Sequence, residues 1–184
     1  MSEKKAIFLD APAMSLAGAG DALAKFSKKA AVLVNADAAG LAAKCEALGG
    51  VKCQAAELAA ALEKNDFCLV EGGEEALAQV LEAANRRTLV VAACAEGVAF
   101  YGMAVNGKAG KVERKVDADD VALTIATIAN LPISADCTAG IIYQVLKDPN
   151  LKLTEITKLE EALARMEQVM ARNSREPWEK HDCA

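Results

Sequence analysis

The stretch RTLVVAACAEGVAFYG, residues 87–102, decides the fold class of this chain. Residues 88–93 form an apolar, β-branched run typical of a strand that is buried on both faces, and residues 98–105 form a second run of the same kind. The four residues CAEG, at positions 94–97, separate the two runs. Because strand ends carry the chemistry in open α/β folds, these positions are the first candidates for a functional site.

Apolar runs and helical segments alternate along most of the chain. Before the quoted stretch, the apolar runs are residues 6–9, 30–34 and 67–70. The helical segments lie around residues 20–26, 38–48, 55–63 and 75–85. Further on, the pattern favours a short edge strand over residues 111–116, a helix with an acidic start over residues 117–129, and a second short helix over residues 138–146. This alternation predicts a three-layer α/β fold, with a mostly parallel sheet and helices on both of its faces.

A last helix, over residues 155–172 with Thr154 as its N-cap, is predicted to follow the α/β domain. It carries one apolar stripe, made of Ile156, Leu159, Leu163, Met166 and Met170. We therefore expect one domain over residues 1–150 and a C-terminal helix and tail over residues 151–184. The stripe must be covered, either by the chain's own domain or by a partner, which is a second copy in a homo-oligomer or another protein. Trp178 in the tail is a candidate anchor of the same interface, unless it is buried on its own domain.

Composition and charge argue against several classes of partner. The chain has 184 residues, a net charge of −5 and a pI of about 5.1, and its basic residues are scattered, so no nucleic-acid partner is expected. No apolar run reaches the roughly 18 residues of a membrane span and no signal peptide is visible, so we expect a cytoplasmic protein that does not enter a membrane. The six cysteines form no CxxC pair and are expected as free thiols.

Acidic residues follow several of the predicted strands. Because parallel strands end at the same edge of a sheet, we expect these acids to gather there. They are Asp10, Asp37, Glu71, Glu74 and Glu96. Converging carboxylate oxygens suit magnesium or manganese, so these residues are the candidate metal ligands. The alternative is that they are solvated loop acids and helix caps, and that the chain has no cofactor. Zinc or copper is not expected, since His181 and Cys183 in the tail supply only two ligands.

The segment GAGDAL, residues 18–23, opens a helix and offers the backbone N–H groups of Gly18 and Gly20 to a phosphate group. It matches the dinucleotide-binding fingerprint only in part, because the third glycine is missing and a loop separates the segment from the first strand. Asn35, at the end of the second strand, and the thiol of Cys94 are further candidates for ligand binding. The spacing indicates no catalytic residue, since nothing pairs a nucleophile with a base.

Residues 116–146, VDADDVALTIATIANLPISADCTAGIIYQVL, resemble the C-terminal element of the alkaline phosphatase superfamily. The matching positions are Asp120, Thr124, Leu131, Pro132, Asp136 and Gly140. Upstream, residues 28–53 and 55–71 are similar to the later half of cofactor-independent phosphoglycerate mutases of the archaeal type. The resemblance covers residues 28–146 in patches, and it implies an alkaline-phosphatase-like core.

The chain departs from this family at the positions that carry the family's chemistry. Enzymes of the family bind two metal ions through Asp and His residues and use a Ser or Thr nucleophile. Where they have Asp-His-Gly or Asp-His-Ser after a strand, this chain has Ala95, Glu96 and Gly97. The segment EGGEEAL, residues 71–77, has acids but no histidine, and no nucleophile segment is recognisable.

The resemblance and the departures together imply a non-catalytic interaction or regulatory subunit, with a small anion as its candidate ligand. The alternative is a residual enzyme of phosphoryl transfer or phosphoester hydrolysis. In that enzyme the strand-end acids would hold magnesium or manganese, and the ion would polarise a phosphoryl oxygen and activate water.

Overall fold

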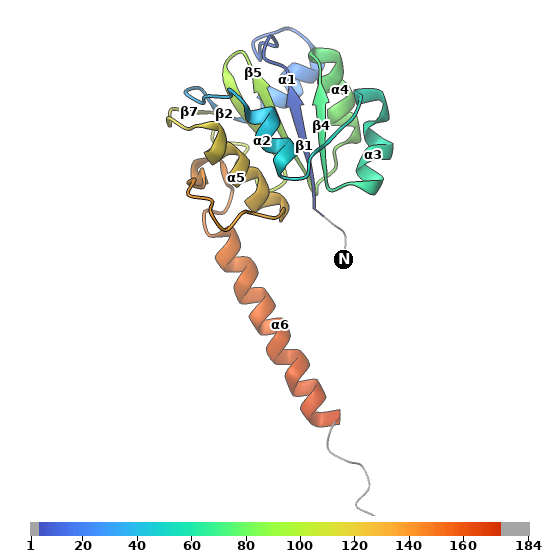
Figure 1. Cartoon of the computed structure of the whole chain (residues 1–184), viewed down its shortest axis with the longest axis vertical. Helices are drawn as coiled ribbons and strands as arrows, with labels where there is room; N and C mark the ends of the chain where they lie inside the picture. Colours follow the sequence, from blue (N-terminus) through green and yellow to red (C-terminus); the bar gives the residue numbers. More distant parts are fainter. Residues whose placement is uncertain (1–3, 174–184) are drawn as a thin grey trace, which may run out of the picture. The chain divides into compact units, whose positions relative to one another are not determined.

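Residues 4–173 are described by the computed structural model, and they belong to two units, Met1–Pro149 and Asn150–Ala184 (Figure 1). The first unit is built on a sheet, and the described part of the second unit, residues 150–173, is mostly one long helix. Trp178, the expected anchor of an interface, lies outside the described residues, as do His181 and Cys183.

A seven-stranded sheet organises the first unit. In chain order the strands are β1 (Lys5–Asp10), β2 (Ala31–Leu33), β3 (Val51–Lys52), β4 (Phe67–Glu71), β5 (Thr88–Cys94), β6 (Gly97–Gly102) and β7 (Lys111–Val112). In space their order is β3-β4-β1-β5-β6-β2-β7. Only β6 runs antiparallel to its neighbours β5 and β2, and every other pair of strands is parallel. The mostly parallel sheet predicted from the sequence is therefore confirmed.

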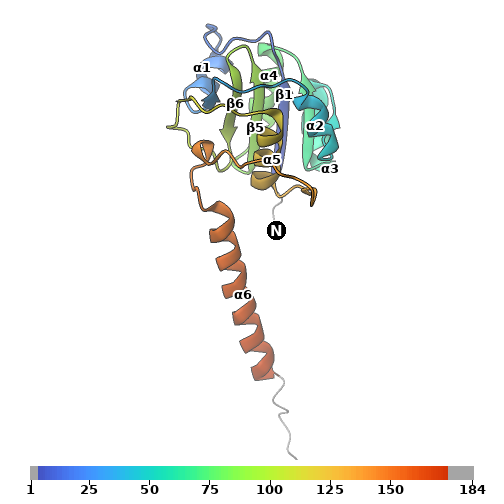
Figure 2. The same ribbon diagram turned by 60° about the vertical axis from the view of Figure 1, so that its left-hand side comes forward.

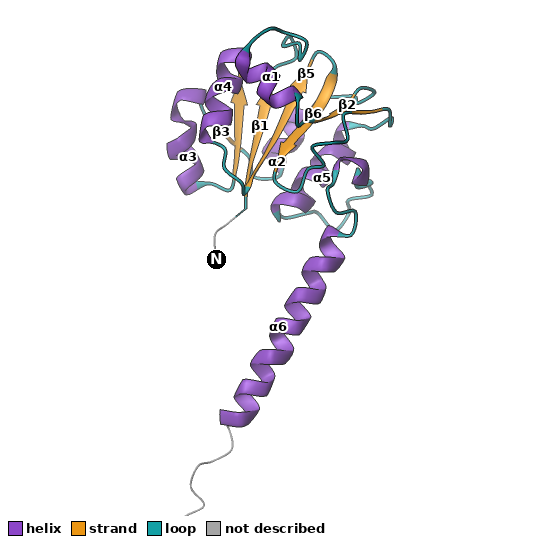
Figure 3. Cartoon of the chain, turned by 180° about the vertical axis from the view of Figure 1, so that it is seen from behind, coloured by secondary structure: helices purple, strands orange, loops and turns teal. Residues whose placement is uncertain are grey.

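Helices cover both faces of this sheet. They are α1 (Asp21–Ser27), α2 (Leu41–Ala47), α3 (Leu58–Lys64) after the 3₁₀ turn η1 (Ala55–Glu57), α4 (Glu74–Ala83) and α5 (Ala118–Ala129). Helix α1 contacts α4 behind the sheet, and α2 contacts α5 in front of it (Figures 1 and 3). Helix α5 also lies against β5 and β1 (Figure 2). The unit is therefore a three-layer α/β fold, as predicted.

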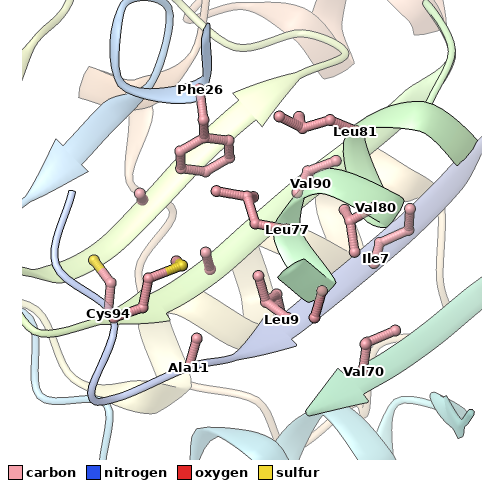
Figure 4. Close-up of a cluster of buried hydrophobic side chains, with 14 of the residues drawn as sticks. Ile7, Leu9, Ala11, Phe26, Val70, Leu77, Val80, Leu81, Val90 and Cys94 are labelled. Atoms are coloured by element: carbon pink, nitrogen blue, oxygen red, sulfur yellow. The ribbon is translucent and has the colours of Figure 1, made fainter. Parts of the chain in front are cut away.

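The core between the sheet and the α1–α4 layer consists of small and medium apolar side chains. Figure 4 shows Phe26 of α1 and Leu77 of α4 packed with Val90 of β5 and Leu9 of β1. All four side chains are buried, and the ring of Phe26 also stacks on Tyr101 at 5.2 Å between centroids. Because helices cover both faces, β5 is buried along its whole length, which explains its continuous apolar sequence.

The segment that follows α5 differs from the prediction. The second short helix expected over residues 138–146 is wrong, because only the single 3₁₀ turn η2 (Tyr143–Val145) forms there. The backbone N–H of Gly140 donates to Oδ1 of Asp120 at 2.7 Å, and the N–H of Ile142 donates to Oγ1 of Thr124 at 3.0 Å. These N–H groups are bound to side chains of α5, so they are not available for helical hydrogen bonds within the segment.

Helix α6 (Leu151–Asn173) belongs to the second unit and begins earlier than predicted. Thr154 is not its N-cap, because the Thr154 N–H already donates to the carbonyl of Asn150 at 2.9 Å, which is a helical i to i−4 bond. Within residues 4–173 there is no helix that combines the length and the apolar character needed to cross a membrane.

Candidate functional site

The carboxyl ends of β1, β4 and β5 meet at one edge of the sheet. Asp10 at the end of β1 is in register with Glu71 at the end of β4 and with Ala93 of β5. The backbone beyond β4 is fixed to the same point, since the N–H of Gly72 donates to the carbonyl of Asp10 at 3.1 Å. The structure therefore brings Asp10 and Glu71 together, as neighbours on adjacent strands.

Lys52 of β3 lies within electrostatic range of this pair of acids. Its Nζ forms an ion pair with Oε1 of Glu46 at 2.8 Å. The hydrogen bond and the charge of Glu46 raise the pKa of Lys52 above its usual value, and the charges of Glu71 and Asp10 raise it further. The Lys52 ammonium is therefore attracted by the acids at the ends of β1 and β4, while its ion-pair partner is Glu46.

Glu96 lies in the two-residue turn of the hairpin that joins β5 to β6, between the paired residues Cys94 and Gly97. Its carboxylate accepts hydrogen bonds from Oγ of Ser15 at 2.5 Å and from the backbone N–H of Leu16 at 3.0 Å. Burial raises the pKa of Glu96, but these hydrogen bonds outweigh burial and leave its pKa below the usual value. The carboxylate therefore attaches the β5–β6 turn to the loop between β1 and α1.

Gly97 allows the same turn to approach β2. Its φ of +129° is in the region that favours glycine, and a Cβ at this position would overlap the carbonyl oxygen of Leu33. The neighbouring residue Val98 pairs with Leu33 in the antiparallel ladder between β6 and β2. The CAEG segment is therefore a close-packed hairpin turn, with Glu96 bound to a neighbouring loop.

The remaining candidate metal ligands, Asp37 and Glu74, have surroundings of their own. Oδ1 of Asp37 accepts the N–H of Ala39 at 2.9 Å, in a turn that follows β2. Glu74 is in the first turn of α4, and its carboxylate occupies the position that a Cβ on Gly20 would take. Among residues 4–173, no group of three or more His, Cys, Asp or Glu side chains is arranged to hold a metal ion.

The candidate ligand-binding residues have separate environments. Gly18 lines a groove of about 510 Å³ beside Met14 and Glu74, and none of the described residues that line this groove is basic. Glu74 therefore makes the groove unfavourable for an anion. Asn35 is exposed in the loop after β2.

Cys94 is buried at the end of β5, where its Sγ donates to the carbonyl of Gly97 at 3.4 Å. Burial raises the pKa of this thiol to about 11. At neutral pH the side chain is therefore protonated and packs as a small apolar residue.

Sequence reasoning missed a groove of about 440 Å³, which lies near the start of β5, at the other end of the strands from Asp10 and Glu71. It is lined by Lys25, Lys29, Arg86 and Tyr101, together with Leu81 and other residues. The side chains of Lys25, Lys29 and Arg86 form no ion pair with any residue between positions 4 and 173. Lys25 belongs to α1, Lys29 to the turn after it and Arg86 to the loop after α4, so the packing of α1 on α4 brings them together, and the sequence does not indicate that contact.

The predicted apolar stripe lies on α6, and its members are exposed. Ile156, Leu159, Leu163, Met166 and Met170 have exposed fractions between 50% and 68%. Leu153 and Val169, which the prediction did not include, are also exposed on this helix. The second unit therefore presents an apolar helix surface about two heptads long.

No protein-family model, curated protein or solved structure matches this chain. The resemblance to the alkaline phosphatase superfamily therefore enters below only as a proposal.

Proposed function

We propose that this chain is a non-catalytic relative of the alkaline phosphatase superfamily that serves as an interaction or regulatory subunit through α6. The observation that carries the proposal is the exposed stripe of Ile156, Leu159, Leu163, Met166 and Met170. Single exposed apolar side chains are common on protein surfaces and need no explanation. An aligned set of them forms a contiguous apolar patch, and such patches mark interaction sites.

The stripe is large enough to support binding. Full burial of one such side chain contributes roughly 1.5–3 kcal/mol, and about three fifths of each is still exposed, so a partner could gain about 6 kcal/mol from the five. Association also costs several kcal/mol in lost freedom, so the partner must supply further complementary contacts. The stripe therefore suits a specific partner surface.

The hydrogen bonds of the strand-end acids support a non-catalytic role. Glu96 accepts from Ser15 and Leu16, and Asp37 accepts from Ala39. Each of these carboxylates already stabilises its own turn or loop, so recruiting it to a metal would break contacts that hold the fold.

The residues of the resembled segment also have a packing role. Asp120 and Thr124 of α5 bind the backbone N–H groups of Gly140 and Ile142. These two side chains therefore fix the segment after α5, a packing role that needs no catalytic chemistry.

The basic groove supports a small anion as a second ligand of this subunit. Lys25, Lys29 and Arg86 supply three cations without ion pairs within residues 4–173, whereas Glu74 lines the groove beside Gly18. We therefore place the candidate anion at the groove of Lys25, Lys29 and Arg86, away from the glycine segment predicted from the sequence.

A magnesium- or manganese-dependent phosphoryl-transfer enzyme remains the second candidate, because Asp10 and Glu71 are neighbours at the ends of β1 and β4. Two carboxylates need further ligands to make a specific site for either ion. Elemental analysis after dialysis against manganese should find about one retained ion per chain if this second function is correct. Retention by the wild type and its loss in Asp10→Asn with Glu71→Gln would favour the enzyme.

The interaction function can be tested with substitutions that leave the helix intact. Leu159→Glu with Leu163→Glu adds two charges inside the stripe, and Thr157→Glu with Gln168→Glu adds two charges on the opposite side of α6. All four positions are exposed and glutamate favours helices, so neither variant should unfold the chain, which far-UV circular dichroism checks.

The tagged full-length chain is expressed at its native level in its own cells and sized by sedimentation in the clarified extract. The wild type and the control variant should sediment in an assembly larger than the single chain of 19.2 kDa, and the stripe variant as the single chain. A wild type that sediments alone, or a stripe variant that keeps the assembly, would contradict the proposed function.

A further inference from the structure

The apolar residues of α6 are spaced as in a two-helix contact. From Ile156 to Met170 the intervals are three, four, three and four residues, which is the a/d pattern of a coiled coil. At 1.5 Å per residue the stripe is about 21 Å long. A straight, narrow stripe of this length suits the side of another helix, which presents apolar residues at the same repeat.

One edge of the stripe is acidic. With 100° between successive residues, Glu160 and Glu167 lie directly beside Ile156 and Leu163. Neither glutamate has an ion pair with any residue of the part described, 4–173. The opposite edge is formed by Ala162 and Val169, which carry no charge, and before them by Glu155, which is paired with Lys152. A partner therefore meets two uncompensated carboxylates along one edge of the stripe.

Three of the four basic residues of α6 lie on the far side of the helix, and the fourth, Lys152, precedes the stripe in line with it and forms an ion pair with Glu155 at 3.1 Å. Lys158, Arg165 and Arg172 point roughly opposite to the stripe, and Arg165 forms an ion pair with Glu161 on that side at 3.9 Å. A helix that binds an anionic lipid surface has its lysines and arginines beside the apolar face. Along the stripe, residues 156–170, the charge pattern of α6 is the reverse, so a membrane surface is a poor partner.

A second copy of α6 is also a poor partner. In antiparallel pairing the acidic edges of the two copies face each other, which sets Glu160 and Glu167 against the same residues of the partner. In parallel pairing Glu160 faces Glu155 of the other copy, while Glu167 faces Ala162. Neither arrangement supplies a cation, and like charges across the seam lower the affinity.

From this complementarity we infer that α6 pairs with a helix of a different protein, whose apolar stripe is bordered by lysine or arginine. The inference rests on the proposed function and specifies its partner. Apolar contact supplies the affinity, and the basic border pairs with Glu160 and Glu167 and selects against self-association.

Two synthetic helices of three heptads test the inference with the full-length chain. Both have isoleucine at a and leucine at d, and they differ only in having lysine or glutamate at every e and g position. Binding is measured by fluorescence anisotropy of the labelled peptide at low and at high salt. The lysine peptide should bind at least about tenfold more tightly than the glutamate peptide, and salt should reduce the difference.

A matched pair of neighbouring substitutions tests the role of the acidic edge. Glu160→Lys reverses a charge beside the stripe, and Glu161→Lys makes the same change on the far side. The first should weaken binding of the lysine peptide by about fivefold, since an attraction becomes a repulsion of similar size, and the second should leave it unchanged.

The outcomes separate the inference from the function on which it rests. Equal binding of both peptides, tighter self-association of the chain than lysine-peptide binding, or binding to phosphatidylserine vesicles would each overturn the inference while leaving α6 an interaction element. The proposed function fails as well if three results come together. These are that neither peptide binds, that the purified chain is monomeric, and that Leu159→Glu with Leu163→Glu does not change sedimentation in the cell extract.

Discussion

Replacing Glu96 by alanine is expected to lower the free energy of unfolding by about 2 kcal/mol at pH 7. The substitution removes the acceptor of two hydrogen bonds, from Ser15 Oγ and from the Leu16 N–H. A buried hydrogen bond to a charged group contributes about 1.5–3 kcal/mol, and the partial exposure of Glu96 reduces this to about 1 kcal/mol for each bond. Chemical denaturation followed by far-UV circular dichroism, in a buffer with EDTA, measures the difference.

The pH dependence gives the same prediction a second test. The pKa of Glu96 is lowered in the folded protein, so the stability that its carboxylate contributes is present above its unfolded pKa of about 4.3. That contribution is lost as the pH falls through the lower, folded value. The difference between wild type and Glu96→Ala should therefore be full at pH 7 and shrink below about pH 4.

Two comparisons isolate the cause. Glu63→Ala removes an exposed glutamate of α3 that has no hydrogen bond or ion pair within the described residues, and it should change stability by less than about 0.5 kcal/mol. Ser15→Ala and Glu96→Ala should be non-additive by about 1 kcal/mol, because they remove the same bond. A metal-ligand role predicts instead that Glu96→Ala has no effect in EDTA and an effect only with manganese, and that result would refute the reasoning.

Three further substitutions or reactions test the structure of the first unit. Gly97→Ala should cost about 3 kcal/mol or more in thermal unfolding, because the backbone is strained for alanine and the new Cβ meets the Leu33 carbonyl, and an unchanged midpoint would contradict the tight turn. Thr124→Val should cost about 2 kcal/mol and accelerate hydrogen exchange at Ile142, whose buried N–H loses its acceptor, while slow exchange there would indicate another partner. At pH 7.5 iodoacetamide should modify exposed Cys137 well before Cys94, whose pKa of about 11 keeps the thiol protonated, and rapid labelling of Cys94 would show that the end of β5 opens.

The sequence allowed the fold class to be predicted because apolar runs and helix periodicity are local signals. The runs at residues 67–70 and 88–93 became β4 and β5, since a strand covered on both faces needs an uninterrupted apolar sequence. By contrast β3 was missed, because it has only two residues, Val51 and Lys52, and both are exposed. Such a short strand is defined only by its hydrogen bonds to β4, so the hydrophobic pattern of the sequence cannot predict it.

The candidate site was harder to predict because its contacts join distant parts of the chain. Strand-end position correctly indicated that Asp10 and Glu71 are neighbours. It could not indicate that Glu96 is bound to Ser15, since that bond depends on how the loop after β1 folds over the β5–β6 turn. Likewise the helix expected over residues 138–146 had a plausible local pattern, but backbone N–H groups of this segment donate to side chains of α5 instead.

The α6 stripe was predicted from periodicity alone, and the structure shows that its side chains are exposed to solvent. Met166 and Met170 are 61% and 60% exposed, whereas Met14 in the first unit is 7% exposed. Methionine oxidation depends on access to the sulfur, so Met166 and Met170 can report whether a partner covers α6. Met14 serves as the buried internal control. They provide a test that needs no substitution and no knowledge of the partner.

The most direct test of the interaction function is the oxidation rate of these methionines, measured by mass spectrometry after brief exposure to hydrogen peroxide. In the purified chain Met166 and Met170 should oxidise rapidly and Met14 slowly. In fresh cell extract, where the partner is present, Met166 and Met170 should be protected severalfold while Met14 is unchanged. Equal and rapid oxidation in the extract, or protection already in the purified single chain, would contradict the account that α6 is the binding surface of this protein.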